Sequence, residues 1–246
     1  MLTVNHTASA NGGRASESHQ GRTVAMESRP FGTCFFEQYA QITLQAILGD
    51  DFAALVNRDR PDLQSPDGRS LGIEVTRAME QSREAEKALL QDISGLTPAG
   101  GGSDYELEAI LESGYAYGLR GGRFIGAREL HYWSMALPMR RILESKVHKA
   151  GSGFYGLFDK MGLFVFSRED LSEAEAVRAM DYTISLQKYQ DIRYNRLYIA
   201  DVNDLFVCNL DDSIGAGYRL SRYPITREQR KAFFHEAIQK QQSTTE

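Results

Sequence analysis

Two carboxylates, Asp62 and Glu74, are the residues of this 246-residue chain that are best placed to do chemistry. Each lies in a short segment typical of a strand, and a Pro-Asp-Gly turn joins the two segments. Side chains alternate along a strand, so Glu74 and Thr76 face away from the apolar set Leu71, Ile73 and Val75. Two carboxylates brought together across the turn repel each other unless a cation lies between them. Because hard divalent cations take oxygen ligands, the pair predicts a site for Mg²⁺ or Mn²⁺.

The same residues resemble a known signature. Pro61-Asp62, followed by Gly72-Ile-Glu-Val-Thr76, is similar to the active-site motif of the PD-(D/E)XK nuclease superfamily, an Asp on one strand and a (D/E)-X-K triplet on the next. The resemblance implies a restriction-endonuclease-like fold and metal-dependent cleavage of nucleic acid. It also implies that the backbone carbonyl of Val75 is a metal ligand, and that Glu37 on the first core helix supports the metal. The match departs from the motif at Thr76, which stands where the lysine is expected.

The missing lysine has two candidate replacements elsewhere in the chain. Lys146 and Lys149 lie on a helix expected over residues 138–150, and their spacing of three makes them neighbours on one flank. If this helix packs beside the strands, either ammonium group could reach the carboxylates. Arg77 adjoins Thr76, but alternation points it to the opposite face. The alternative is a catalytically inactive protein of nuclease fold that binds nucleic acid or another protein.

The order of elements predicts an α/β fold, a mixed sheet flanked by helices. We expect one nuclease-like domain over residues 31–246, with an insertion of helices and loops at 78–137, after a disordered tail at 1–30. The expected helices cover residues 33–52, 138–150, 172–189 and 226–239. The expected strands cover residues 59–64, 71–77, 162–167, 195–201 and 204–209.

Charge and cysteine content narrow the class of protein. The net charge is -5, yet residues 119–150 carry seven Lys and Arg against two Glu, a local excess compatible with phosphate binding. Two cysteines, Cys34 and Cys208, give no disulfide framework and no zinc spacing, which favours a reducing cytoplasm. No apolar run has the roughly 20 residues that a membrane span needs.

These observations lead to one expected function. It is a Mg²⁺- or Mn²⁺-dependent endonuclease that hydrolyses phosphodiester bonds of DNA, in restriction, phage defence or repair. The expected partners are DNA and either a second copy of the chain, as a homodimer, or a separate subunit that completes the site, with no membrane involved.

Overall fold

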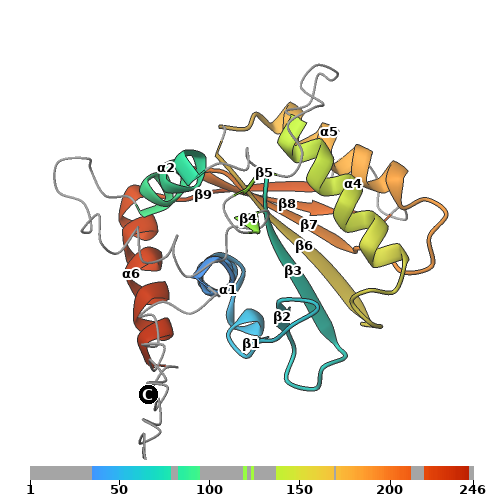
Figure 1. Ribbon diagram of the computed structural model, residues 1–246, viewed down its shortest axis with the longest axis horizontal. Coiled ribbons are helices and arrows are strands. Elements are labelled where there is room, and N and C mark those ends of the chain that lie inside the picture. Colours follow the sequence, from blue (N-terminus) through green and yellow to red (C-terminus); the bar gives the residue numbers. More distant parts are fainter. Residues whose placement is uncertain are drawn as a thin grey trace, which may run out of the picture.

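The computed structural model of the chain describes residues 35–78, 83–94, 119–120, 123–124, 137–168, 170–211 and 219–243. In this part of the chain, five α-helices flank a seven-stranded mixed sheet of order β1-β2-β3-β6-β7-β8-β9 (Figure 1). The strands are β1 (Val56–Asn57), β2 (Leu63–Gln64), β3 (Leu71–Ala78), β6 (Lys160–Ser167), β7 (Arg196–Ala200), β8 (Asp204–Asn209) and β9 (Leu220–Pro224). The expected α/β class with a mixed sheet is therefore confirmed.

The sheet combines two kinds of strand pairing. The first three strands form an antiparallel meander, β1 with β2 and β2 with β3. The middle of the sheet is parallel, with β6 between β3 and β7. Antiparallel β8 and β9 then complete the far edge. A parallel pair needs a crossover connection, and the chain between β3 and β6 contains the helix that covers this part of the sheet.

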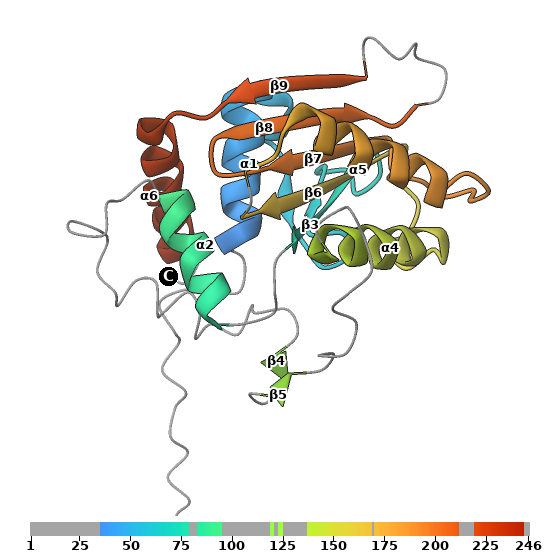
Figure 2. The ribbon, with the colours of Figure 1, turned by 90° about the horizontal axis from the view of Figure 1, so that it is seen from above.

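The helices form two layers, one on each face of the sheet (Figures 1 and 2). One layer holds α1 (Phe35–Leu48), α2 (Arg83–Ser94) and α6 (Arg227–Ser243). The other holds α4 (Leu137–Gly151) and α5 (Glu173–Leu186). A short 3-10 helix, η1 (Asp50–Phe52), follows α1, and β4 (Leu119–Arg120) pairs with β5 (Arg123–Phe124) outside the main sheet.

Alternation along β3 and β6 divides their side chains between two cores. Ile73 and Val75 pack with the α1 layer, together with the neighbouring strand's Phe164. Leu163 and Val165 pack with the α4 layer. Since Glu74 is paired with Leu163 in register, its side chain is directed at α4. The strand thus presents one carboxylate to the interior of a helix–sheet layer.

The expected helices and strands agree well with the structure where the local signal is strong. Ser172 caps α5, at the first residue of the range expected for this helix, and forms a reciprocal capping box with Glu175. The α4 helix matches the range expected for it to within one residue at each end. The strand expected over residues 204–209 is β8, and it pairs with β7 as the turn between them suggests.

The strand expected over residues 59–64 is wrong in its first half. Residues 59–61 are not part of a strand, and β2 is only Leu63–Gln64, so Asp62 lies in the bend directly before it. Pro61 has no N–H to continue the ladder, while the Arg58 N–H donates to the Asp62 carbonyl at 2.8 Å and closes the chain on itself. Two expectations lie outside the described residues: the tail at 1–30 and most of the insertion at 78–137.

Candidate active site

Glu74 is a buried carboxylate held by a lysine from across the layer. It lies in the middle of β3, and only 4% of the residue is exposed. The Nζ atom of Lys146 lies 2.5 Å from its Oε1 atom. Lys146 is itself 4% exposed, so the two charges meet almost without water. Of the two lysines that the sequence offers, Lys146 is therefore the one that reaches the predicted site.

The position of Lys146 follows from the face that α4 buries. The buried apolar residues of this helix are Met139, Leu143, Val147 and Ala150. Their spacing of three and four residues makes one stripe, and Lys146 falls within it, between Leu143 and Ala150. A lysine on a core-facing stripe needs an anionic partner to stay charged. Glu74 supplies this partner from β3.

Asp62 is fixed beside Glu74 by the backbone of β3. The β2–β3 register pairs Leu63 with Ile73, so one step further along the ladder places Asp62 opposite Glu74. The Val75 N–H donates to Asp62 Oδ2 at 2.7 Å, which fixes the Asp62 side chain at this edge of β3. Side chains at opposed positions of a meander share one face. The structure therefore brings the two predicted carboxylates together.

The electrostatics of Asp62 reflect this proximity. Burial raises the pKa of Asp62 to about 7, and the negative charge of Glu74 adds to the rise. The Val75 hydrogen bond and the charge of Lys146 act in the opposite direction. One ammonium group thus serves two carboxylates, and a carboxyl with a pKa so far above its ordinary value marks a candidate functional site.

Two tyrosines that sequence reasoning did not select enclose the carboxylates. Tyr155 is 3% exposed, and its hydroxyl makes no hydrogen bond of ordinary geometry to the described residues. Burial, and after it the charge of Glu74, raise the pKa of Tyr155 well above its ordinary value. Tyr194 donates to the Lys146 carbonyl at 3.4 Å, and its backbone is held at both polar groups by Gln187. A buried, neutral hydroxyl thus lies next to the carboxylates.

The other predicted residues lie at different distances from this centre. Thr76 is buried on the same face of β3 as Glu74. Lys149 instead lies over the ring of Phe154, 5.3 Å from its centroid. Glu37 is buried in the α1 layer, where Asn57 Nδ2 lies 3.5 Å from its Oε2 atom, so its support of a metal stays a prediction. Arg77 stacks on Phe36 in the α1 layer, which confirms that it faces away from Glu74.

Comparison with known proteins adds no relative. No family model, no curated protein and no solved structure matches this chain. In the part of the chain that the structure describes, no helix combines the length and apolar character that crossing a membrane requires. The functional argument therefore depends on the geometry of the site itself.

The oxygen atoms available at the site are suited to a hard divalent cation. Within the described residues there is no group of three or more Asp, Glu, His or Cys side chains at metal-binding spacing. Asp62 and Glu74 supply two carboxylates, and the Val75 carbonyl points to the same strand edge as the Val75 N–H that contacts Asp62. Mg²⁺ is commonly held by one or two carboxylates and keeps several waters. The donor set fits Mg²⁺ or Mn²⁺ and does not fit a fully protein-ligated ion.

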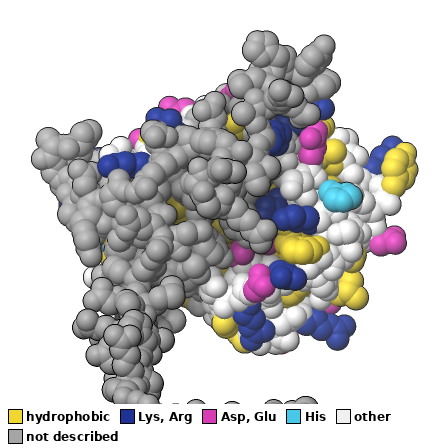
Figure 3. Space-filling view, viewed as in Figure 1, with side chains coloured by type: hydrophobic (Ala, Val, Ile, Leu, Met, Phe, Trp, Pro, Cys, Tyr) yellow, Lys and Arg dark blue, Asp and Glu magenta, His cyan; other side chains and the backbone are white. Residues whose placement is uncertain are grey.

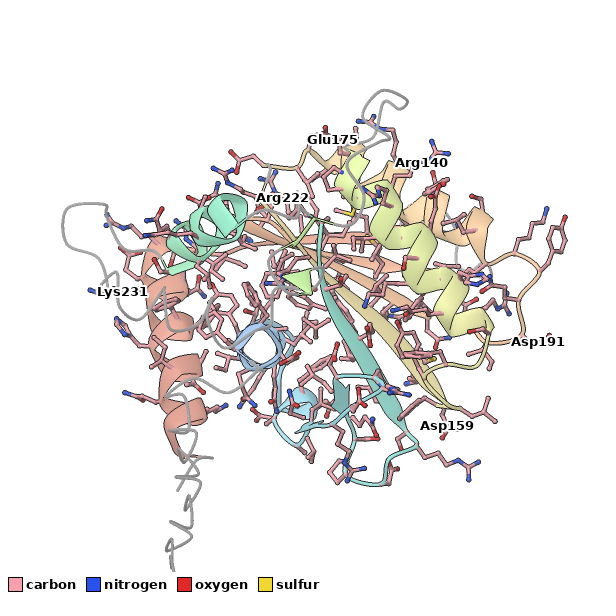
Figure 4. All side chains as sticks on the ribbon, in the orientation of Figure 1. Arg140, Asp159, Glu175, Asp191, Arg222 and Lys231 are labelled. Atoms are coloured by element: carbon pink, nitrogen blue, oxygen red, sulfur yellow. The ribbon has the colours of Figure 1, made fainter. Side chains whose placement is uncertain are left out.

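The site lies inside the α4–β3 layer. In Figure 4, Arg140 lies at the beginning of α4, and Asp159 lies by the opposite end of the helix. The Asp159 N–H donates to the Arg69 carbonyl at 2.9 Å, so this end of the layer is where β3 begins. Glu74 is the fourth residue of β3.

Proposed function

We propose that the chain is a metal-dependent endonuclease that hydrolyses phosphodiester bonds of DNA, a divergent member of the PD-(D/E)XK superfamily. The observation that carries this proposal is the contact of Lys146 with Glu74, next to Asp62. The motif lacks a lysine at Thr76, and a lysine from α4 brings the same charge to the same carboxylates. Catalysis depends on where a group lies in space, so a lysine from another element can serve.

The arrangement of elements supports the same proposal. The superfamily is expected to have a helix, strands that bear the acids, a helix and a strand. The order α1, the β1–β2–β3 meander, α4 and β6 agrees with it. One acid, Asp62, lies in the bend directly before β2, the other, Glu74, lies in β3, and the lysine comes from α4. This agreement concerns only the order of helices and strands. It is consistent with a lysine on α4 that lies next to the two acids.

A buried ion pair of this kind contributes little to stability in its own right. The cost of removing two charges from water offsets much of their attraction, so such pairs are weak evidence for a stabilising role. Here a third charge, on Asp62, adds repulsion to the cluster. Two carboxylates that repel each other are typical of a site that binds a cation, which favours function over stability as the reason for the cluster.

Asp62, Glu74 and the Val75 carbonyl would hold the divalent cation. When bound, Mg²⁺ or Mn²⁺ would neutralise charge on the phosphate and lower the pKa of a bound water. Lys146 would orient the attacking water from its place at Glu74 and stabilise negative charge that develops on the phosphate. Tyr155, whose raised pKa keeps its hydroxyl protonated, would donate a hydrogen bond to a phosphate oxygen. Thr76 would add a neutral hydroxyl on the same face.

The second candidate is a protein of the same fold that binds without cleaving. The sequence feature that favours it is Thr76 in place of the motif lysine. The Lys146–Glu74 contact weakens this argument, because a lysine is present at the carboxylates. The two candidates differ in one measurable respect. A protein that only binds does not cleave DNA, whichever metal ion is added.

Cleavage of supercoiled plasmid and of labelled oligonucleotides in Mg²⁺ and in Mn²⁺ tests the proposal. We expect nicking that chelation of the metal stops. The cleavage rate should fall at least about 100-fold in Asp62→Asn and in Glu74→Gln, because metal ligands matter at least as much as the residues that hydrogen-bond to them. Asp204→Asn is the matched control, since Asp204 is a buried carboxylate paired with Arg222 elsewhere in the sheet. Equal cleavage by wild type and both site variants would rule out the proposed site.

A further inference from the structure

The segment after α4 carries an exposed aromatic ring between two cations. Phe154 is a large apolar side chain that is 45% exposed. The guanidinium carbon of Arg60 lies 4.9 Å from the ring centroid, and Lys149 Nζ lies 5.3 Å from it. The cations come from different parts of the chain, the loop before Asp62 and the last turn of α4.

This ring lies close to the candidate active site. A Cβ atom at Gly72 would lie 2.7 Å from the Pro61 ring and 3.0 Å from Phe158, so the loop before Asp62 and the segment after α4 meet above β3. Gly72 is two residues before Glu74 and faces the same side of the strand. Tyr155, next to Phe154, is buried toward the carboxylates. One dipeptide therefore reaches from the surface to the site.

We propose that Arg60, Lys149 and Phe154 form the surface that receives a nucleic-acid strand, with an unpaired base against Phe154 and backbone phosphates at the two cations. This inference rests on the proposed nuclease function and names the form of its substrate. An aromatic ring can stack only on a base whose face is open, so single-stranded or locally unpaired DNA fits the surface better than an intact duplex. Arg60 and Lys149 both lie over the ring, so a base that stacks on it would displace a cation from the ring toward a neighbouring phosphate.

The charges around the ring leave room for this partner. Arg60 is paired with Asp59 at 3.2 Å, but both side chains are more than half exposed, and such a surface pair is weak. Among the described residues, the structure records no ion pair for Lys149. Figure 3 shows that basic side chains on the described part of this face are interspersed with acidic and hydrophobic ones.

Fluorescence anisotropy with a labelled single strand and the matching duplex tests the inference. The titrations use the whole chain in EDTA, so that binding is measured without cleavage. We expect Phe154→Ala to weaken single-strand binding about tenfold or more, the size of one lost base–aromatic stack, and to affect duplex binding less. Phe154→Trp should retain the binding. The double variant Arg60→Gln, Lys149→Gln should reduce the salt dependence by an amount close to that of two phosphate contacts.

Leu157→Ala is the control variant, because Leu157 is an exposed apolar residue of the same segment and has no aromatic ring on which a base could stack. Single-strand binding by Phe154→Ala that equals binding by Leu157→Ala would overturn the inference, and so would an equal loss on duplex. The cleavage assay with Asp62→Asn separates the two proposals. Phe154-dependent binding without any cleavage would retain the surface and remove the nuclease. Asp62-dependent cleavage with unchanged binding by Phe154→Ala would do the reverse.

Discussion

At the scale of single residues, Lys146 decides how the site is interpreted. The residue belongs to the buried stripe of α4, where a charged side chain is costly unless it is paired. Its partner Glu74 is equally buried in β3. The sequence contains this signal, since Lys146 follows Leu143 by three residues and precedes Ala150 by four. What the sequence does not contain is the partner, because the packing of α4 on β3 brings together residues 72 positions apart.

The variant Lys146→Met separates a catalytic from a structural role of the lysine. We expect it to lower kcat by about 100-fold or more, as removal of a donor to a developing negative charge does. It should also destabilise the protein by about 3–5 kcal/mol, because it leaves Glu74 buried without its cation. Single-turnover cleavage and urea unfolding are the two measurements. Arg141→Met, which removes an exposed cation from the same helix, is the control.

A second variant tells the two roles apart. Adding Glu74→Gln to Lys146→Met removes the unpaired charge and should recover much of the lost stability without recovering any cleavage. If Lys146→Met cleaves as fast as Arg141→Met, the lysine has no part in the reaction.

Tyr155 differs from Lys146 in how visible it is in the sequence. Neither its residue type nor its position after a helix indicates a functional site. Only the fold reveals its buried hydroxyl.

At the scale of elements, sequence patterns predict the centre of the fold better than its edges. The strand that becomes β6 is a continuous apolar run, buried on both faces, and α5 begins at a capping box. The edge strands β1 and β9 have two and five residues, most of them not buried. They therefore lack the alternation of apolar residues from which a strand is predicted. The bend at Asp62 was equally hidden, since it depends on hydrogen bonds from Arg58 and Val75.

Gly72 provides the test at this scale, because it lets two segments close over β3. In Gly72→Ala, the new methyl group would press against Pro61 and Phe158 and displace the loop that carries Asp62. We expect metal affinity to fall about tenfold or more, as when a group that positions a ligand is removed. The cost in stability should be about 1–3 kcal/mol, the usual result of overpacking. Calorimetry and urea unfolding measure the two effects.

Gly162→Ala is the matched change on the other face of the sheet. Gly162 pairs with Ile73, and a Cβ atom there would lie 2.9 Å from the Tyr198 ring and 3.3 Å from Ile73. This variant should lose stability with its metal affinity intact. The account of the Pro61 loop is wrong if Gly72→Ala and Gly162→Ala change metal affinity to the same extent.

At the scale of the whole molecule, one sheet separates two apolar cores, and the candidate site lies in the α4 side. The aromatic residues of α1 and α6 contact one another on the other side, with Phe35 and Phe234 ring centroids 5.3 Å apart. This layer buries apolar side chains, and the proposed catalytic residues Asp62, Glu74 and Lys146 are not part of it. Such burial is the dominant favourable term in folding, and it lets the molecule carry a cluster of repelling carboxylates at its other face.

This cluster should be visible in how global stability depends on pH without metal. The raised pKa of Asp62, about 7 against an ordinary 3.8, means that the folded protein retains a proton that the unfolded chain loses. The resulting stabilisation is fully present below about pH 4 and is lost as pH rises toward 7. Asn at position 62 cannot titrate, so Asp62→Asn should gain stability relative to wild type over this range. The groups facing Asp62 are Glu74, Lys146 and Asp59, and both proteins keep them.

Urea unfolding in EDTA at several pH values from 4 to 8 measures this difference. Comparing the two proteins cancels the contributions of other acids, among them Asp67, whose pKa is lowered by hydrogen bonds from Ser65 and Ser70. A stability difference between wild type and Asp62→Asn that stays constant from pH 4 to 8 would contradict the raised pKa.

Metal titration by calorimetry tests the central claim most directly, because it asks whether Asp62 and Glu74 share a divalent cation. We predict that wild type binds one Mg²⁺ or Mn²⁺ per chain, with release of a proton near neutral pH as Asp62 ionises. Asp62→Asn and Glu74→Gln should each abolish the binding, and Asp204→Asn should retain it. Absence of binding by the wild type, or binding by Asp62→Asn as tight as that of the wild type, would contradict the account.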